Sequence, residues 1–479
     1  MSDDIPVSID GRLFWNHEIR NRGYFFCWLT SFAFLLGLFA VWSEQTYLLP
    51  LFIVTGYTAV FFAFMRAVNI WRDLFNPLCL ILLIGFVRFS CPGFLLLNGT
   101  EPSEGIGLFY QLMQLSDREW QWGHALALTG LLAVVLGWIL VPGRRVDGKC
   151  LNFYLTDGAK YAAFAGMLVG FMALSVFLVS NASLEVLESG AFRETTIQVG
   201  TGKYFFMAYM MMAGSVLFSC YLIARGYKWL ALVPVTITTV AYWTLGGRGR
   251  ALTSVAAGLL LLWYIGRENK RWDRVTFRPK YALVVSVGIL FVVWFLYVGA
   301  LYRGGLGLRA LPESLSLSGL WKYIEGSIFT DVGQLHSLAG AFAIGPGVLG
   351  GQTFIGALTW PLEKFLPIPG KSAGVFIVQT LVGFSDEGKW GVHASLIGDA
   401  YLNFGLAGVS IVMVVLGVLL KFVYVKFREG SLQSVVYVLA LLYGLQIFLV
   451  SIEVWPQTLT VLTFTLLLML LGKTIFQVR

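Results

Sequence analysis

The chain has 479 residues, of which 57% are hydrophobic and only 13% charged, and its formal net charge is +8. A soluble protein of this length needs a larger polar surface, so the composition excludes an ordinary soluble domain. The apolar runs do not alternate in polarity, as the strands of a membrane β-barrel would. The basic residues cluster beside these runs, which is typical of membrane topology signals and not of nucleic-acid binding.

The sequence predicts an all-α polytopic membrane protein, because run after run reaches the roughly 20 apolar residues that a membrane-crossing helix needs. The first 24 residues are polar and lack the features of a cleaved signal peptide. We expect about twelve transmembrane helices, which in chain order are Phe25–Ser43, Tyr47–Val68, Pro77–Leu97, Gly123–Val141, Lys160–Ser180, Tyr204–Arg225, Tyr227–Leu245, Ala251–Gly266, Tyr281–Tyr302, Ala394–Val425, Ser434–Ser451 and Thr458–Phe476.

The charges between these runs predict the topology. Basic residues gather in every second loop, most densely between Arg267 and Lys280, and acidic residues such as Glu185 and Glu188 lie in the loops between them. The positive-inside rule then places both termini in the cytoplasm. Residues 1–302 would hold helices one to nine, residues 303–393 a large outer loop, and residues 394–479 the last three helices. A loop of that length is usually functional, and its stretch Phe354–Phe365 could form an amphipathic helix on the membrane surface.

Several arginines do not follow this charge pattern. Arg88 lies in the middle of the third predicted span, where a charge is costly, so we expect it to face the bundle interior and either bind an anionic ligand or form an internal ion pair. Arg248 and Arg250 lie in a glycine-rich outer turn. Guanidinium groups there fit phosphate, although an ordinary turn contacting lipid headgroups would look the same. Arg193 and Arg303 also lie on the outer side.

A polar stripe opens the tenth predicted span. Ser395, Asp399 and Asn403 are spaced four residues apart and therefore share one helix face. This stripe points into the bundle, or Asp399 is solvated at the outer surface near a helix N-terminus. His393 and His336 are candidates for a general base, or are polar anchors at the membrane interface.

The sequence contains no P-loop, no Asp-x-Asp element and no cluster of His and Cys residues. We therefore expect no metal site and no cofactor. The arginines together indicate an outward-facing site for a lipid-linked phosphate or pyrophosphate.

The stretch from Phe354 to Gly408 resembles the C-terminal signature of bacterial oligosaccharide repeat-unit polymerases, the O-antigen polymerase or Wzy type. The signature has a proline-rich element with a basic residue, here residues 366–371 ending in Lys371. It continues as Ser-x-x-Gly-acid-x-Tyr-x-Asn-Phe-Gly-x-x-Gly, here residues 395–408. The family often has Glu at the acidic position, where this chain has Asp399.

The resemblance implies a GT-C-like helical bundle in the bacterial inner membrane, with the large loop and the active site in the periplasm. It implies a metal-independent glycosyltransferase that transfers a growing glycan from undecaprenyl pyrophosphate to one lipid-linked repeat unit. Asp399 and His393 would be the catalytic residues. The residues that would contact pyrophosphate or glycan are Arg88, Arg193, Arg248, Arg250, Arg303, Lys371, Tyr401 and Asn403.

Two other functions fit the sequence less well. An O-antigen ligase has a similar fold and donor, but residues 395–405 favour a polymerase. A secondary transporter or flippase of lipid-linked sugars usually shows inverted repeats, which we do not find. Expected partners are lipid-linked glycans, membrane lipids, a chain-length regulator and a flippase, in lipopolysaccharide or another polysaccharide pathway.

Overall fold

The computed structural model describes residues 32–33, 35, 48–71, 75–90, 113–141, 157–181, 202–227, 229–244, 256–258, 260, 294, 297–298, 301, 315–329, 335–359, 372–383, 392–428 and 434–475. Every regular element within these ranges is helical. The elements are α2 (Leu48–Trp71), α3 (Pro77–Gly85), the π-helix η1 (Phe86–Ser90), α6 (Asp117–Leu140), α7 (Asp157–Asn181), α9 (Gly202–Ala224), α10 (Leu232–Thr244), α14 (Leu317–Phe329), α15 (Leu335–Ile344), α16 (Gln352–Thr359), α17 (Ala373–Val382), α18 (Ser395–Arg428), α19 (Ser434–Leu449), the short 3₁₀ helix η6 (Ile452–Val454) and α20 (Trp455–Ile475).

Six of the described helices are long and apolar enough to cross a membrane, namely α2, α6, α7, α9, α18 and α20. Shorter apolar helices accompany them, among them α3 with η1, α10 and α19. The prediction of a multi-pass helical membrane protein is thus supported. The number of about twelve spans stays a prediction, because those expected at Phe25–Ser43, Ala251–Gly266 and Tyr281–Tyr302 lie mostly outside the described residues.

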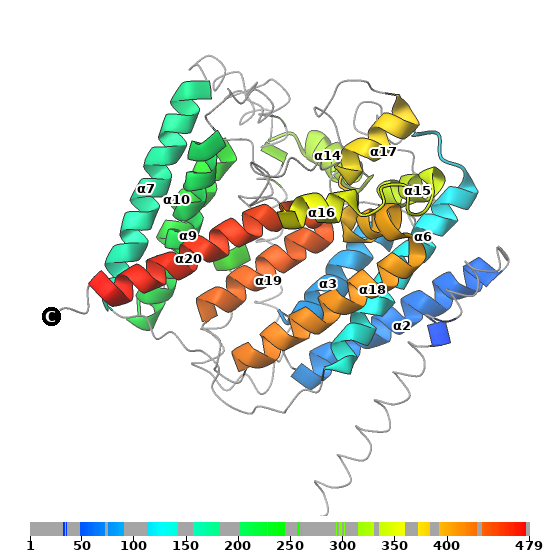
Figure 1. Ribbon diagram of the computed structural model, residues 1–479, viewed down its shortest axis with the longest axis horizontal. Helices are drawn as coiled ribbons and strands as arrows, with labels where there is room; N and C mark the ends of the chain where they lie inside the picture. Colours follow the sequence, from blue (N-terminus) through cyan, green and yellow to red (C-terminus); the bar gives the residue numbers. More distant parts are fainter. Residues whose placement is uncertain are drawn as a thin grey trace, which may run out of the picture.

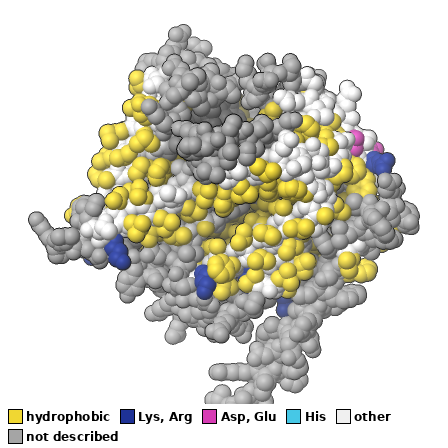
Figure 2. Space-filling view, viewed as in Figure 1, with side chains coloured by type: hydrophobic (Ala, Val, Ile, Leu, Met, Phe, Trp, Pro, Cys, Tyr) yellow, Lys and Arg dark blue, Asp and Glu magenta, His cyan; other side chains and the backbone are white. Residues whose placement is uncertain are grey.

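The exterior of the long helices is apolar. On α18, Ile411, Val415, Leu419 and Phe422 are exposed and form one stripe along the helix. Figure 2 shows hydrophobic side chains gathered in a band across the long helices, with few Lys or Arg side chains at its margins. An apolar outer surface of this extent is favourable only against lipid or another apolar partner.

The helices form two groups joined by α19 and α20. Figure 1 shows α7, α9 and α10 on one side and α2, α3, α6 and α18 on the other, with α19 and α20 between them. Helix α6 packs against α2, α15 and α18, and most of its side chains are buried. Its first turn has a capping box, in which Ser116 and Glu119 satisfy each other's free backbone N–H groups.

Small residues let these helices approach closely, as is usual where lipid supplies no hydrophobic driving force. A Cβ atom on Gly137 of α6 would overlap the Val414 carbonyl of α18, and one on Gly417 of α18 would overlap the Val134 carbonyl of α6. The two helices are therefore in backbone contact at this crossing. Gly170 and Gly214 serve the same purpose between α7 and α9.

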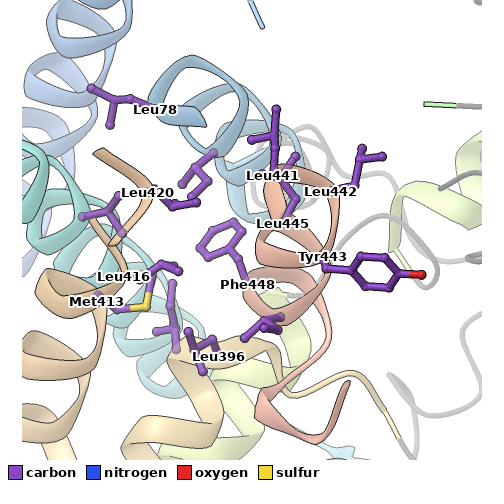
Figure 3. Close-up of a cluster of buried hydrophobic side chains, with 14 of the residues drawn as sticks. Leu78, Leu396, Met413, Leu416, Leu420, Leu441, Leu442, Tyr443, Leu445 and Phe448 are labelled. Atoms are coloured by element: carbon purple, nitrogen blue, oxygen red, sulfur yellow. The ribbon is translucent and has the colours of Figure 1, made fainter. Parts of the chain in front are cut away.

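A cluster of large apolar side chains fills the space between α18 and α19. Figure 3 shows Phe448 pointing from α19 toward Met413, Leu416 and Leu420 of α18. Phe448 is fully buried and meets the ring of Phe89 in η1 edge to face, with 6.3 Å between ring centroids. This cluster connects α18, α19 and η1.

The segment 303–393, expected as a large loop, contains the short helices α14 to α17. Helix α15 is buried between α6 and α18, and the indole of Trp122 in α6 stacks on the ring of Phe342 in α15 at 5.0 Å. Only part of the amphipathic helix expected at Phe354–Phe365 can be compared, because residues 360–371 lie outside the described residues. Helix α16 does have exposed Ile355 and Leu358, but its opposite face is buried in the bundle.

The backbone contact between α6 and α18 yields a stability prediction. Gly417→Val should lower the free energy of unfolding by about 1–3 kcal/mol, because the added side chain forces the helices apart. Thermal unfolding of the detergent-solubilised protein measures this change. Leu419→Val, at an exposed position two residues away, should change it by less than about 0.5 kcal/mol. Equal effects of the two substitutions would contradict the crossing described above.

Candidate functional site

Helix α18 is broken at Gly405, the glycine that follows Asn403 and Phe404 in the polymerase-like motif. Its φ of 70° and ψ of −162° lie in a region that is accessible essentially only to glycine. Helix α18 has 34 residues, more than one membrane span needs, and the break divides it into two segments. Residues 406–428 alone measure about 35 Å, enough to cross the hydrocarbon layer. Residues 395–404 form a separate segment that carries the first part of the motif.

The break releases two backbone carbonyls that a continuous helix would keep for itself. The carbonyl of Tyr401 accepts a hydrogen bond from the N–H of Gly347 at 3.1 Å, and that of Leu402 accepts from Leu349 at 2.8 Å. Both donors lie in the turn between α15 and α16. The turn is rich in glycines with positive φ, including Gly345 and Gly347. The motif segment is thereby joined to residues 335–359 by main-chain bonds.

Asp399 lies at the centre of the site and is fully buried. Its Oδ1 atom accepts hydrogen bonds from the Thr353 hydroxyl at 2.6 Å and from the Asn403 side-chain amide at 2.9 Å. Its Oδ2 atom accepts one from the backbone N–H of Ile452 at 3.2 Å. The first alternative for the polar stripe is therefore correct, since it points into the bundle, and the alternative of a solvated Asp399 at the surface is wrong.

The orientation of the Asn403 side-chain amide is set by a neighbouring backbone N–H group, which can donate a hydrogen bond but cannot accept one. The backbone N–H of Thr353 can only donate, and it points to Oδ1 of Asn403 at 3.4 Å. The Nδ2 atom must then face Thr353 Oγ1, at 2.6 Å, and the carbonyl of Asp399, at 2.7 Å. The Thr353 hydroxyl, the Asn403 amide and the Ile452 N–H thus all act as donors to the Asp399 carboxylate.

Arg88 reaches the same region from η1. Its Nη1 atom donates to the carbonyl of Leu449, the last residue of α19, at 3.2 Å. A cation here also interacts favourably with the C-terminal end of a helix. Leu449 lies three residues before Ile452, so Arg88 and Asp399 bind opposite ends of one short turn. Arg88 is half-buried, as expected for a residue facing the bundle interior, and it lies in a π-helix, an element frequent at functional sites.

The remaining motif residues make packing and hydrogen-bond contacts within the fold. Ser395 adopts a positive φ of 58°, and its hydroxyl accepts from the N–H of Gly398, which begins the helix. The ring of Tyr401 stacks on Phe342 with 6.2 Å between centroids. A Cβ on Gly408 would overlap the side chain of Phe404. The spacing of the motif is therefore explained by one broken helix that packs against α15 and α16.

The other predicted residues fall in two groups. His393 is exposed in the segment just before α18, and His336 is buried in α15. Five predicted ligand residues lie outside the described residues: Arg193, Arg248, Arg250, Arg303 and Lys371. Within the described ranges, no three His, Cys, Asp or Glu residues are grouped as metal ligands.

Sequence reasoning missed Thr353 and the backbone N–H of Ile452. Thr353 is 2% exposed and contacts both Asp399 and Asn403. The signal available was a threonine two residues after a pair of glycines in the predicted outer loop, which is too common to identify a site. The N–H of Ile452 could not be found from side-chain patterns, because every non-proline residue carries one.

With this geometry established, comparison with known proteins adds one match. The family model described as O-antigen polysaccharide polymerase Wzy matches residues 384–478, about a fifth of the chain. The match confirms the resemblance to the Wzy-type family. It contains the motif segment, α18, α19 and α20, and so includes Asp399, Asn403 and the turn at Ile452. Searches of curated proteins and of solved structures found no match.

The break in α18 gives a second prediction. Gly405→Ala should lower the free energy of unfolding by about 1–3 kcal/mol, because alanine is strained at this φ and ψ and its Cβ would lie 3.3 Å from that of Pro346. Thermal unfolding in detergent measures the loss. Ala407→Val adds methyl groups to an exposed site in the same helix and serves as the control. An unaffected Gly405→Ala variant would argue against the broken helix.

Proposed function

We propose that this protein polymerises oligosaccharide repeat units linked to undecaprenyl pyrophosphate at the periplasmic face of the bacterial inner membrane. The observation that carries this proposal is that the Wzy-type match contains Asp399 and Asn403, which form a buried hydrogen-bonded network with Thr353. A buried carboxylate with three donors is costly to build without a use for it. The multi-pass helical architecture agrees with a substrate that is anchored in lipid.

The proposed reaction transfers the growing glycan to a single lipid-linked unit. An acceptor hydroxyl attacks the anomeric carbon, the bond from that carbon to the lipid pyrophosphate breaks, and undecaprenyl pyrophosphate leaves. The hydroxyl proton passes to His393, the exposed titratable group just before the motif segment. The oxygens of Asp399 already accept bonds from Thr353, Asn403 and Ile452, so we do not assign the proton to Asp399. Its role in the proposed reaction is to orient the acceptor side of the site.

The leaving pyrophosphate gains negative charge as the bond breaks, and fixed cations stabilise such charge strongly. We assign this role to Arg88, Arg248, Arg250 and Arg303, and contacts to phosphate or sugar to Arg193, Lys371 and the motif residues Tyr401 and Asn403. Guanidinium groups can neutralise pyrophosphate without a divalent ion. The proposed enzyme is therefore metal-independent, and its proposed partners are a chain-length regulator and a flippase.

Two alternatives remain for the same architecture. A ligase would use the same donor but transfer the completed glycan to a lipid core. A transporter or flippase would move lipid-linked sugars without joining them. The match to a polymerase family favours polymerisation over both alternatives.

The first test is the size distribution of lipid-linked glycans in a strain that lacks this gene. We expect only single repeat units on the lipid carrier, because no other step in the proposed reaction lengthens the glycan. The measurement is gel or mass analysis of the extracted lipid-linked pool. Long chains that accumulate on the carrier would instead show a ligase, and unchanged lengths would rule out the polymerase.

A second test concerns the proposed pyrophosphate contacts. Arg248→Ala should reduce kcat by on the order of 10²-fold, the loss typical when one group that stabilises developing charge is removed. The assay uses purified protein, lipid-linked repeat units and a chelating agent, so that the same measurement tests metal independence. Lys473→Ala, at the exposed end of α20, is the control. Equal rates for Arg248→Ala and the wild type would remove Arg248 from the site.

A further inference from the structure

We propose that Thr353 is a positioning residue for the transfer reaction, and that its hydroxyl group fixes Asp399 and Asn403 relative to the acceptor. The proposal rests on the function proposed above and assigns a role to a residue outside the polymerase-like motif. Thr353 is the second residue of α16, a helix that belongs to the segment before the matched region.

The hydroxyl of Thr353 uses both of its hydrogen-bonding capacities inside the site. It donates its proton to Asp399 Oδ1 at 2.6 Å and accepts from Asn403 Nδ2 at 2.6 Å. Asn403 Nδ2 also donates to Asp399 Oδ1 at 2.9 Å, which closes a ring of three side chains. Each bond restricts the other two, so the torsion angles of all three side chains are fixed together.

The backbone of Thr353 adds a fourth contact, from its N–H to Asn403 Oδ1 at 3.4 Å. This bond belongs to the same attachment as the bonds from Gly347 to Tyr401 and from Leu349 to Leu402. The main-chain bonds hold the turn before α16 on the broken helix. Thr353 is the point at which this attachment reaches the side chains of the motif.

Burial makes the hydroxyl difficult to replace. Thr353 is 2%, Asn403 3% and Asp399 0% exposed. Solvent therefore cannot supply a donor to Asp399 Oδ1 or an acceptor to Asn403 Nδ2 once the hydroxyl is gone. The carboxylate and the amide would rotate to seek other partners, and the Asp399 bond to the turn at Ile452 would change with them. Valine at this position keeps the shape of threonine and removes only the polar atom.

The experiment compares three substitutions in helix α16. Thr353→Val removes the hydroxyl, and Thr353→Ser retains it. Thr359→Val is the matched control, because the Thr359 hydroxyl bonds the Ile355 carbonyl of its own helix at 2.6 Å. Each protein is purified, its thermal unfolding is checked, and kcat and KM are measured with lipid-linked repeat units. Glycan length is measured in the deletion strain carrying each of these variants or the wild-type gene.

We expect Thr353→Val to lower kcat at least about tenfold, with KM changed less than about threefold, since the lost bonds position groups without removing the substrate contacts. Thr353→Ser should stay within about threefold of the wild type in kcat, and Thr359→Val should equal it. A loss of fold alone would lower the yield of active protein, but it would not be rescued selectively by serine.

Several outcomes would overturn the proposal. A wild-type kcat in Thr353→Val, or a kcat in Thr353→Ser as low as in Thr353→Val, would show that the hydroxyl does not position the site. If the Thr353→Val protein fails to accumulate, Thr353→Cys is measured in its place, because a thiol is only a weak hydrogen-bond donor. A wild-type kcat in Thr353→Cys would overturn the proposal, and a reduced kcat would support it. Absence of elongation by the wild-type protein would overturn the proposed function, and this inference with it.

Discussion

Asp399 places a carboxylate where solvent does not reach it, so the protein itself must supply its hydrogen bonds. It does so from three separate parts of the chain: Thr353 in α16, Asn403 one turn further along α18, and the backbone of Ile452 between α19 and α20. Any change in the relative placement of these elements leaves a buried charge with too few donors. This one requirement therefore fixes how residues 335–359, α18 and the α19–α20 turn meet.

The break at Gly405 and the network at Asp399 depend on each other. A continuous α18 would keep the Tyr401 and Leu402 carbonyls for its own helix, and the turn before α16 would lose its attachment. Without that attachment Thr353 would not reach Asp399. The close crossing of α6 and α18 at Gly137 and Gly417 holds residues 406–428 of α18 against α6. Residues 395–404, before the break, are held by the network at Asp399.

The arrangement also clarifies how a polymerase of lipid-linked glycans could divide its tasks. The buried network gives a fixed geometry at one side of the site, and Arg88 binds the C-terminal end of α19 beside it. Cations are proposed for the pyrophosphate, whose charge grows during transfer. In the proposed reaction, a rigid acceptor side and a cationic donor side would let the same site accept glycans of increasing length, because only the reacting ends need to be held.

The sequence alone determined the helical membrane class, the positions of α2, α6, α7, α9, α18 and α20, and the face shared by Ser395, Asp399 and Asn403, since hydrophobic length and helical spacing are local properties. The motif also predicted the family match. The tertiary structure decided that Asp399 is buried, that Gly405 breaks the helix, and that Thr353 and the Ile452 N–H complete the site. The hydrogen bonds from Thr353 and Ile452 to Asp399 join residues about 50 positions apart in sequence. No local pattern contains them, because they depend on how separate helices pack.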